Sequence, residues 1–185
     1  MPAPLFVTFS AGAAGPWRIE RISPVVGESL APASRLAIAE APVLGPAAPD
    51  TRWSLRGATG NTRYTTKAEV AALAAKQEGL GRTDATRAAL IPIRKSEAWW
   101  ALAQDERRAI FEESSRHIGI GMDYLPGVAR RLHHARELGE PFDFLTWFEY
   151  APDRSDAFEE MVARLRATEE WRYVEREVDV RLSSV

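Results

Sequence analysis

The order of strand-like and helix-like segments in the second half of the chain restricts its fold more than any other feature of the sequence. Apolar and β-branched runs alternate with helical periodicity and are separated by turns such as Pro126-Gly127. The predicted segments are a strand at 88–93, one long helix at 97–119, strands at 128–138 and 142–150, a helix opening near Ser155, and a strand at 170–182. This β-α-β-β-α-β order is that of the ferredoxin-like unit.

The first half of the chain has a similar but weaker pattern. Short strands are predicted at 5–10, 17–26 and 35–40, and residues 53–64 are ambiguous. Thr66 and Glu69 form a capping-box pattern that opens a helix over 66–79. We therefore expect two ferredoxin-like subdomains, a degenerate one at 1–86 and a second at 87–185. Together they form an α+β architecture with an antiparallel sheet.

Composition excludes several classes of function. The 185 residues carry 24 Lys and Arg against 26 Asp and Glu, which gives a formal net charge of -2 and no general basic field for nucleic acid or an anionic membrane. The chain has no cysteine, so disulfides, thiolate metal sites and covalent c-type haem attachment are excluded. The N-terminal residues lack a signal-peptide pattern, and no apolar run is long enough for a membrane span. We expect a cytoplasmic protein.

Three polar residues fall at positions that the pattern places inside. Arg130 shares a strand face with Val128 and Leu132, and Glu170 falls on the core face of the last predicted strand. A buried charge needs a partner or a function, so each residue belongs either to an internal ion pair or to a site. His117 lies near the end of the predicted helix 97–119, where it is either a core histidine with one hydrogen bond or a ligand.

Common catalytic and metal-binding motifs are missing. His133 and His134 are neighbours on a predicted strand and point to opposite faces, so they are poor partners for one metal. The sequence has no zinc spacing, no G-x-S-x-G elbow and no phosphate-binding glycine loop. Residues 119–121, Gly-Ile-Gly, end a predicted helix instead of opening one.

Several blocks of sequence together resemble those of chlorite dismutases. The blocks are IPIRKSEAWW at 91–100, FEESSRH at 111–117, YLP at 124–126, ARRLHH at 129–134, GEPFDFLTWFEY at 139–150 and LRATEEW at 165–171. The resemblance covers residues 60–182 well and the first 50 loosely. The chain length is similar to that of the short, dimeric members. The resemblance therefore implies a homodimer with the dimeric α/β-barrel fold.

The resemblance also implies a non-covalent haem b. In that reading His117 is the proximal iron ligand, Glu170 accepts a hydrogen bond from it, and Lys95 completes this network. Arg130 corresponds to the distal arginine and Gln77 to a glutamine that hydrogen-bonds it. The remaining positions that match residues around the haem are Trp99, Trp100, Trp147 and the distal Leu125, with Asn61 and Tyr64 as propionate contacts.

The activity implied by the resemblance is the conversion of chlorite into chloride and dioxygen, with formation of an O–O bond. A related activity, coproheme decarboxylation, is associated with a Tyr-Pro-x-x-Lys pattern, whereas this chain has Ile91-Pro92-Ile93-Arg94-Lys95. Those enzymes also have Gln or His where this chain has Arg130. Two further alternatives are a haem-binding protein without catalytic activity and a haem-free ferredoxin-like protein.

Overall fold

Eight antiparallel strands close into a barrel in the computed structural model, which describes residues 3–60 and 63–185. The strand order around the barrel is β1-β3-β2-β8-β5-β7-β6-β4. The strands are β1 (Phe6–Gly12), β2 (Trp17–Val26), β3 (Arg35–Ala41), β4 (Thr51–Ala58), β5 (Arg87–Lys95), β6 (Val128–His134), β7 (Phe144–Tyr150) and β8 (Val174–Ser184). Every predicted strand is present, although two of them have different ends, and the first part of the ambiguous segment at 53–64 belongs to β4, which ends at Ala58.

Each half of the chain contributes one continuous part of the barrel. The second half supplies the order β8-β5-β7-β6, which is the ferredoxin-like order for a β-α-β-β-α-β unit, and the first half supplies β2-β3-β1-β4 in the same manner. The two parts join where β2 pairs with β8 and β4 with β6. The predicted fold class is confirmed. The division at residue 86 stays a prediction, because the two parts share one barrel.

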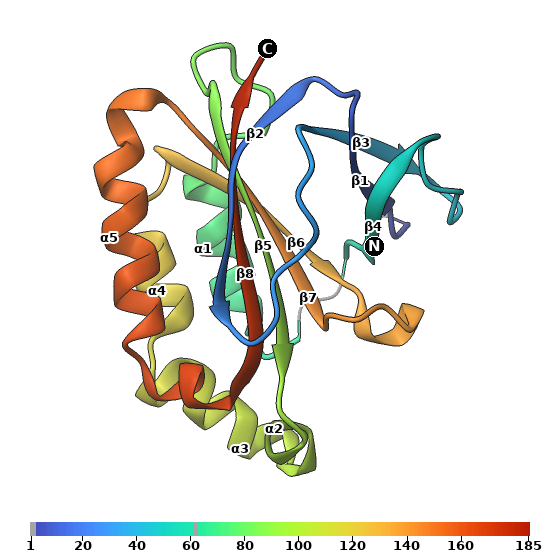
Figure 1. Cartoon of the computed structure of the whole chain (residues 1–185). Coiled ribbons are helices and arrows are strands. Elements are labelled where there is room, and N and C mark those ends of the chain that lie inside the picture. The colour runs from blue at the N-terminus through green and yellow to red at the C-terminus, as the bar shows by residue number, and fades with distance from the viewer. Residues whose placement is uncertain (1–2, 61–62) are drawn as a thin grey trace.

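Helices are concentrated on the outer face of the second-half strands (Figure 1). They are α1 (Lys67–Lys76), α2 (Glu97–Ala101), α3 (Gln104–Arg108), α4 (His117–Met122) and α5 (Ser155–Arg166). The predicted capping box opens α1, where Thr66 Oγ1 accepts a hydrogen bond from the Glu69 backbone. The first half has α1 as its one helix in the described part of the chain. Because α1 contacts α4, this helix lies beside the second-half helices, and no helix of the described residues lies over β1 and β3 (Figure 1).

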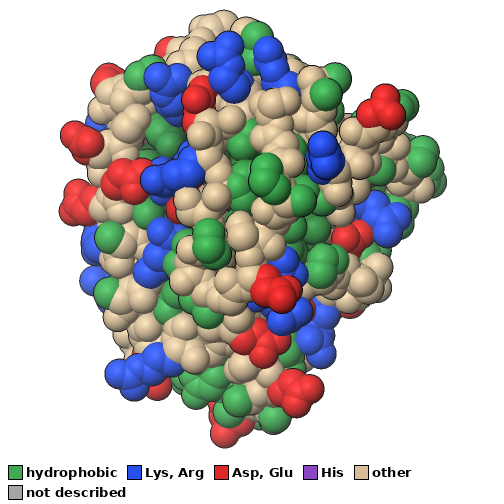
Figure 2. All heavy atoms as spheres, viewed as in Figure 1, with side chains coloured by type: hydrophobic (Ala, Val, Ile, Leu, Met, Phe, Trp, Pro, Cys, Tyr) green, Lys and Arg blue, Asp and Glu red, His purple; other side chains and the backbone are tan. Residues whose placement is uncertain are grey.

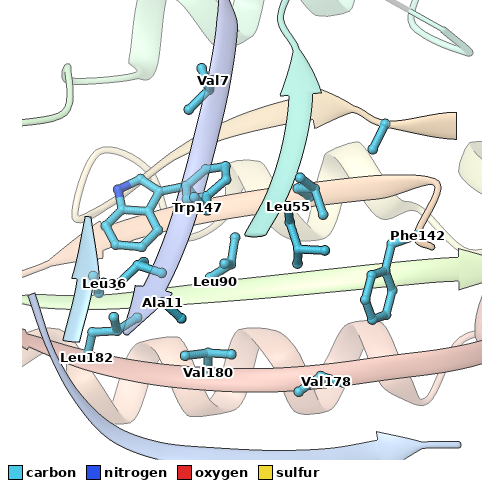
Figure 3. Close-up of a cluster of buried hydrophobic side chains, with 14 residues drawn as sticks. Val7, Ala11, Leu36, Leu55, Leu90, Phe142, Trp147, Val178, Val180 and Leu182 are labelled. Carbon is cyan, nitrogen blue, oxygen red and sulfur yellow. The ribbon is translucent and has the colours of Figure 1, made fainter. Parts of the chain in front are cut away.

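Two apolar layers follow from the alternation of side chains along the strands. One layer fills the barrel, where Phe9, Leu90, Trp147 and Val180 are almost fully buried (Figure 3). The second lies between the outer face and α5; its members include Ile91, Phe148, Phe158 and Met161. Because β5 and β7 are covered on both faces, their sequences are nearly continuous apolar runs, whereas β8 alternates apolar with charged residues over 178–182.

The long helix predicted over 97–119 is wrong. This stretch consists of α2, α3, a π-helix at Ala109–Ser114 and α4, with Arg116 in the left-handed conformation at φ 53°. His117 therefore opens a new short helix instead of closing a long one. The left-handed residue breaks the helix because L-residues avoid that conformation inside regular helices.

Two strand ends were also mispredicted. The strand predicted over 128–138 ends at His134 and is followed by a 3-10 turn at Arg136–Leu138. The last strand begins at Val174, and Glu170 belongs to a 3-10 helix at Glu169–Tyr173. Glu170 is buried as expected, but it is held there by this turn and not by strand alternation.

The surface agrees with the balanced composition. Positive and negative side chains are interspersed over the face seen in Figure 2. Within residues 3–60 and 63–185, no helix has the length and apolar character needed to cross a bilayer.

Candidate functional site

A cavity of about 250 Å³ lies on the outer face of the second-half strands, beneath α4 and α5. His117 and Arg130 both line it, the first from α4 and the second from β6. Its other walls are mostly apolar and include Leu73, Ile91, Phe111, Ile118, Leu132, Phe148, Val162, Leu165 and Trp171. A second cavity of about 90 Å³ shares Phe111, His117, Leu132 and Thr146 with the first, so the two are adjacent compartments around the same imidazole.

His117, Glu170 and Lys95 form a line behind the cavity, as expected from the sequence. The His117 Nδ1 lies 2.6 Å from Glu170 Oε1, and Lys95 Nζ lies 3.2 Å from Glu170 Oε2. The second contact is an ion pair without hydrogen-bond alignment. Glu170 is 2% exposed and Lys95 6% exposed, whereas His117 faces the cavities. A carboxylate on Nδ1 leaves Nε2 as the imidazole nitrogen that can bind a ligand.

The charges of Glu170 and Lys95 stabilise each other. Burial alone would raise the pKa of Glu170, but His117 and Lys95 outweigh it and hold that pKa below its usual value. Burial lowers the pKa of Lys95, and the nearby carboxylates offset part of that effect. The Lys95 ammonium also lies over the Trp99 ring, 4.1 Å from its centroid. Glu170 is therefore a fixed anion behind the histidine.

The local backbone explains how His117 is positioned. The π-helix brings Glu112 under the first turn of α4, where its carboxylate accepts hydrogen bonds from the backbone N–H groups of Ile118 and Gly119 at 2.7 and 3.2 Å. An anionic cap at a helix N-terminus satisfies donors that have no partner inside the helix. Ser115 Oγ accepts the backbone N–H of Glu170 at 3.0 Å. One segment therefore fixes both members of the His117–Glu170 pair.

Arg130 reaches the same cavity from the sheet. Its Nη2 donates to the Gly121 carbonyl oxygen at 2.5 Å, and its buried Nε has no acceptor within the described residues. No carboxylate among these residues lies within salt-bridge distance of the guanidinium, and burial lowers the pKa of Arg130 to about 10. The side chain thus presents a positive charge and a free donor to the cavity.

Gln77 hydrogen-bonds Arg130, as the resemblance implies, but through the backbone of the arginine. Its Nε2 donates to the backbone carbonyl of Arg130 at 2.6 Å and not to the guanidinium. Gln77 is the C-cap residue of α1 and lines the larger cavity. It links α1 to β6 beside the site.

Two of the predicted aromatic contacts line the smaller cavity. Trp99 is fully buried and its Nε1–H has no acceptor among the described residues. Tyr64 lines the same cavity, and its hydroxyl accepts a hydrogen bond from Arg107 Nη1 at 2.9 Å. Trp100 lines neither cavity, and its indole donates to Asp143 Oδ2 at 3.1 Å. Asn61 lies outside the described residues.

Two expected contacts lie elsewhere. Trp147 points into the barrel, because its neighbours Thr146 and Phe148 are the β7 residues that face the cavity. Leu125 precedes Pro126 in the loop between α4 and β6 and lines a separate cavity of about 480 Å³. Neither residue touches the cavities around His117.

The sequence analysis missed several residues that surround the imidazole. Phe111 stacks on His117 with ring centroids 4.6 Å apart, and Trp171 lies nearly parallel to it at 6.1 Å. The Trp171 indole donates to the buried Glu177, which also pairs with Arg166. Phe111 and Trp171 fall inside the resemblance blocks, but the helix expected over 97–119 and the strand expected over 170–182 hid their orientation toward His117.

These features fit a metal carried by a large planar ligand. Among the described residues no group of three or more His, Cys, Asp or Glu side chains could hold a bare metal ion. A single imidazole with a carboxylate behind it suits an axial ligand, and the apolar walls suit a macrocycle. The acceptorless Nε–H of Arg130 and Nε1–H of Trp99 are buried donors that a bound group with acceptor atoms would satisfy. The residues present therefore fit the haem expected from the sequence.

Comparison with known proteins points the same way. The family model "Chlorite dismutase" matches residues 45–184. A dimeric chlorite dismutase from Nitrobacter winogradskyi is 57% identical, with a TM-score of 0.89 over 97% of this chain and 99% of that chain. A chlorite dismutase from Candidatus Nitrospira defluvii in complex with imidazole is 20% identical, with a TM-score of 0.65 over 97% of this chain and 91% of that chain, and shares the fold.

A comparison with curated proteins gave no match. The family model nevertheless spans most of the chain, and the Nitrobacter winogradskyi structure aligns over almost all of it. The chain belongs to the chlorite dismutase family.

Proposed function

We propose that this protein binds haem b without a covalent bond, through His117, and converts chlorite into chloride and dioxygen. The observation that carries the proposal is His117, which is paired with Glu170 and lines one cavity together with an unneutralised Arg130. A bound haem would supply an iron that exchanges electrons with the chlorite oxygen atoms. The residues of the chain itself orient the histidine and hold the substrate anion.

Glu170 and Lys95 act from behind the histidine. The Glu170 carboxylate accepts a hydrogen bond from the Nδ1–H of His117, which fixes the tautomer and directs the Nε2 lone pair toward the cavity. A fixed negative charge at 2.6 Å also makes the imidazole a stronger electron donor to the metal. Lys95 keeps Glu170 ionised and thereby keeps this effect in place.

Arg130 serves the substrate side. A guanidinium about 4 Å from an anion stabilises it by about 4 kcal/mol at an effective dielectric of about 20. Because its pKa is about 10, Arg130 stays charged at neutral pH in spite of its burial. We propose that it holds chlorite as the O–Cl bond breaks, and keeps the leaving chlorine oxide close so that the O–O bond forms before escape.

The residues at the cavity argue against coproheme decarboxylation. That activity is associated with a tyrosine at the position of Ile91, and this side chain lines the cavity as an apolar wall. The described lining of the cavity of about 250 Å³ includes no tyrosine, and the hydroxyl of Tyr64, which lines the cavity of about 90 Å³, is hydrogen-bonded to Arg107. A haem-binding role without catalysis is an outcome of the test below.

We also propose that the protein is a homodimer, because a 57% identical relative is a dimeric chlorite dismutase. A cytoplasmic location stays a prediction of the sequence.

Dioxygen release on addition of chlorite tests the proposed function. Haem-reconstituted protein on an oxygen electrode is expected to release nearly one O2 per chlorite, with chloride as the other product. Arg130→Ala should keep its haem and lose most of the activity. The matched control is Arg131→Ala, since Arg131 pairs with Glu40 and His133 and lines neither cavity. A full haem spectrum without oxygen release would move the function to haem binding.

A further inference from the structure

Gly121 and Arg130 fit each other at the cavity wall. The Gly121 carbonyl accepts the hydrogen bond from Arg130 Nη2, and a Cβ atom added at Gly121 would lie 2.2 Å from Arg130 Nη1. Real Cβ atoms do not approach so closely, so the guanidinium occupies the space that any other residue would fill. Gly121 itself is a buried residue of α4, four positions after His117.

The guanidinium has no other partner to fix it. It has no ion pair among the described residues, and its Nε has no acceptor. Gln77 holds the backbone carbonyl of Arg130 and not its side chain. The position of the charge is therefore set by one carbonyl and by the missing side chain at Gly121.

We propose that Gly121 is the positioning residue for Arg130 and thereby determines how strongly the cavity holds an anion. The inference rests on the proposed function in taking an anion as the ligand. A carbonyl orients the guanidinium without neutralising it, whereas a carboxylate would compete with the substrate for its charge. The small residue lets the group lie against α4 at the edge of the cavity.

A pair of glycine substitutions in the same helix separates this role from general packing. Gly121→Ala retains the carbonyl but forces the guanidinium away. Gly119→Ala is the matched control, because its Cβ would lie 3.4 Å from the flexible end of Arg116. Alanine favours the helical conformation more than glycine, so both variants are expected to fold.

The first measurement uses the haem-free protein and NMR of its arginine side chains. The Arg130 guanidinium protons should exchange slowly with water in wild type and in Gly119→Ala, and rapidly in Gly121→Ala. Equal exchange in both variants would overturn the positioning role. This result does not depend on haem or on chlorite, so it is distinct from a failure of the proposed function.

The second measurement uses the haem-loaded protein and two iron ligands, fluoride and imidazole, followed by absorbance. A change in the distance between the charge and the anion between about 4 Å and about 6 Å alters anion affinity about tenfold at an effective dielectric of about 20. We expect a change of this size in fluoride affinity in Gly121→Ala, no change for neutral imidazole, and an altered KM for chlorite. Unchanged fluoride affinity, or an equal change for both ligands, would contradict the proposal.

Discussion

Buried polar side chains inside the barrel and on its outer side differ in whether their N–H groups have an acceptor within the protein. Inside the barrel, Trp147 Nε1 donates to Glu149 at 2.9 Å, and His133 Nδ1 donates to the Leu145 carbonyl at 2.9 Å. On the outer side, the Nε1–H of Trp99 and the Nε–H of Arg130 have no acceptor among the described residues. The inner N–H groups are hydrogen-bonded within the protein, whereas the two outer N–H groups can donate to a bound ligand.

This difference separates structural from functional residues better than residue type does. Trp147 and Trp99 are equally buried, and both belong to the family blocks. One completes its hydrogen bonds within the core and the other does not. Buried polar groups are nearly always paired, so the exceptions indicate where another molecule binds.

The largest expected effect on stability is at Trp147. Trp147→Ala should lower the free energy of unfolding by about 3–5 kcal/mol, because it leaves a cavity in the barrel core. Haem affinity of the folded fraction should be unchanged. Denaturant unfolding of the haem-free protein and a haem titration measure the two quantities. Loss of haem with unaltered stability would place Trp147 at the ligand instead.

The second prediction concerns His133 and pH. Burial lowers the pKa of His133 from 6.5 to about 4. Between these two pH values the unfolded chain binds a proton at this residue and the folded chain does not. The contribution of neutral His133 to the free energy of unfolding is fully present above pH 6.5. It is lost as the pH drops toward 4, by about 3 kcal/mol in total. Urea unfolding of wild type and His133→Gln across this range isolates the effect. A constant difference between the two proteins would refute it.

Glu170→Gln tests the line behind His117. A neutral amide cannot be a full charge partner for Lys95 or for the imidazole, so haem affinity should fall about 10- to 100-fold. The control is Glu169→Gln, whose exposed carboxylate contacts Ser114. Haem affinity is measured by titration of the haem-free proteins. Equal affinities would mean that Glu170 is a structural anion only.

The smallest effect is expected at Trp100. Trp100→Phe removes the hydrogen bond to Asp143 and should cost about 1 kcal/mol of stability without altering haem affinity. Thermal unfolding measures the stability, and a haem titration measures the haem affinity. A marked loss of haem would show that Trp100 reaches the ligand.

Sequence reasoning went furthest where local rules and tertiary structure agree. The strand order of the second half and the capping box at Thr66 follow from periodicity and local hydrogen bonding, and the structure has both. The His117–Glu170–Lys95 line came from the resemblance, and its residues lie together.

The helix break before His117 and the orientation of Trp147 depend on interactions that sequence periodicity does not reveal. The helix breaks before His117 because Arg116 is left-handed and because the Glu112 carboxylate, six residues before Ile118, caps the next helix. A six-residue spacing is not part of the helical periodicity. Trp147 was misassigned because both faces of β7 are buried, so an apolar run does not tell which side faces the ligand. Strand register decides that question, and it is set by pairing with β5 and β6.

The central claim is that the outer cavity binds haem through His117, and a haem titration followed by the Soret absorbance tests it most directly. Wild type should bind one haem per chain. His117→Ala should lose affinity by more than about 100-fold, while Trp147→Phe, changed inside the barrel, should bind like wild type. An unchanged Soret band and unchanged affinity in His117→Ala would contradict the account.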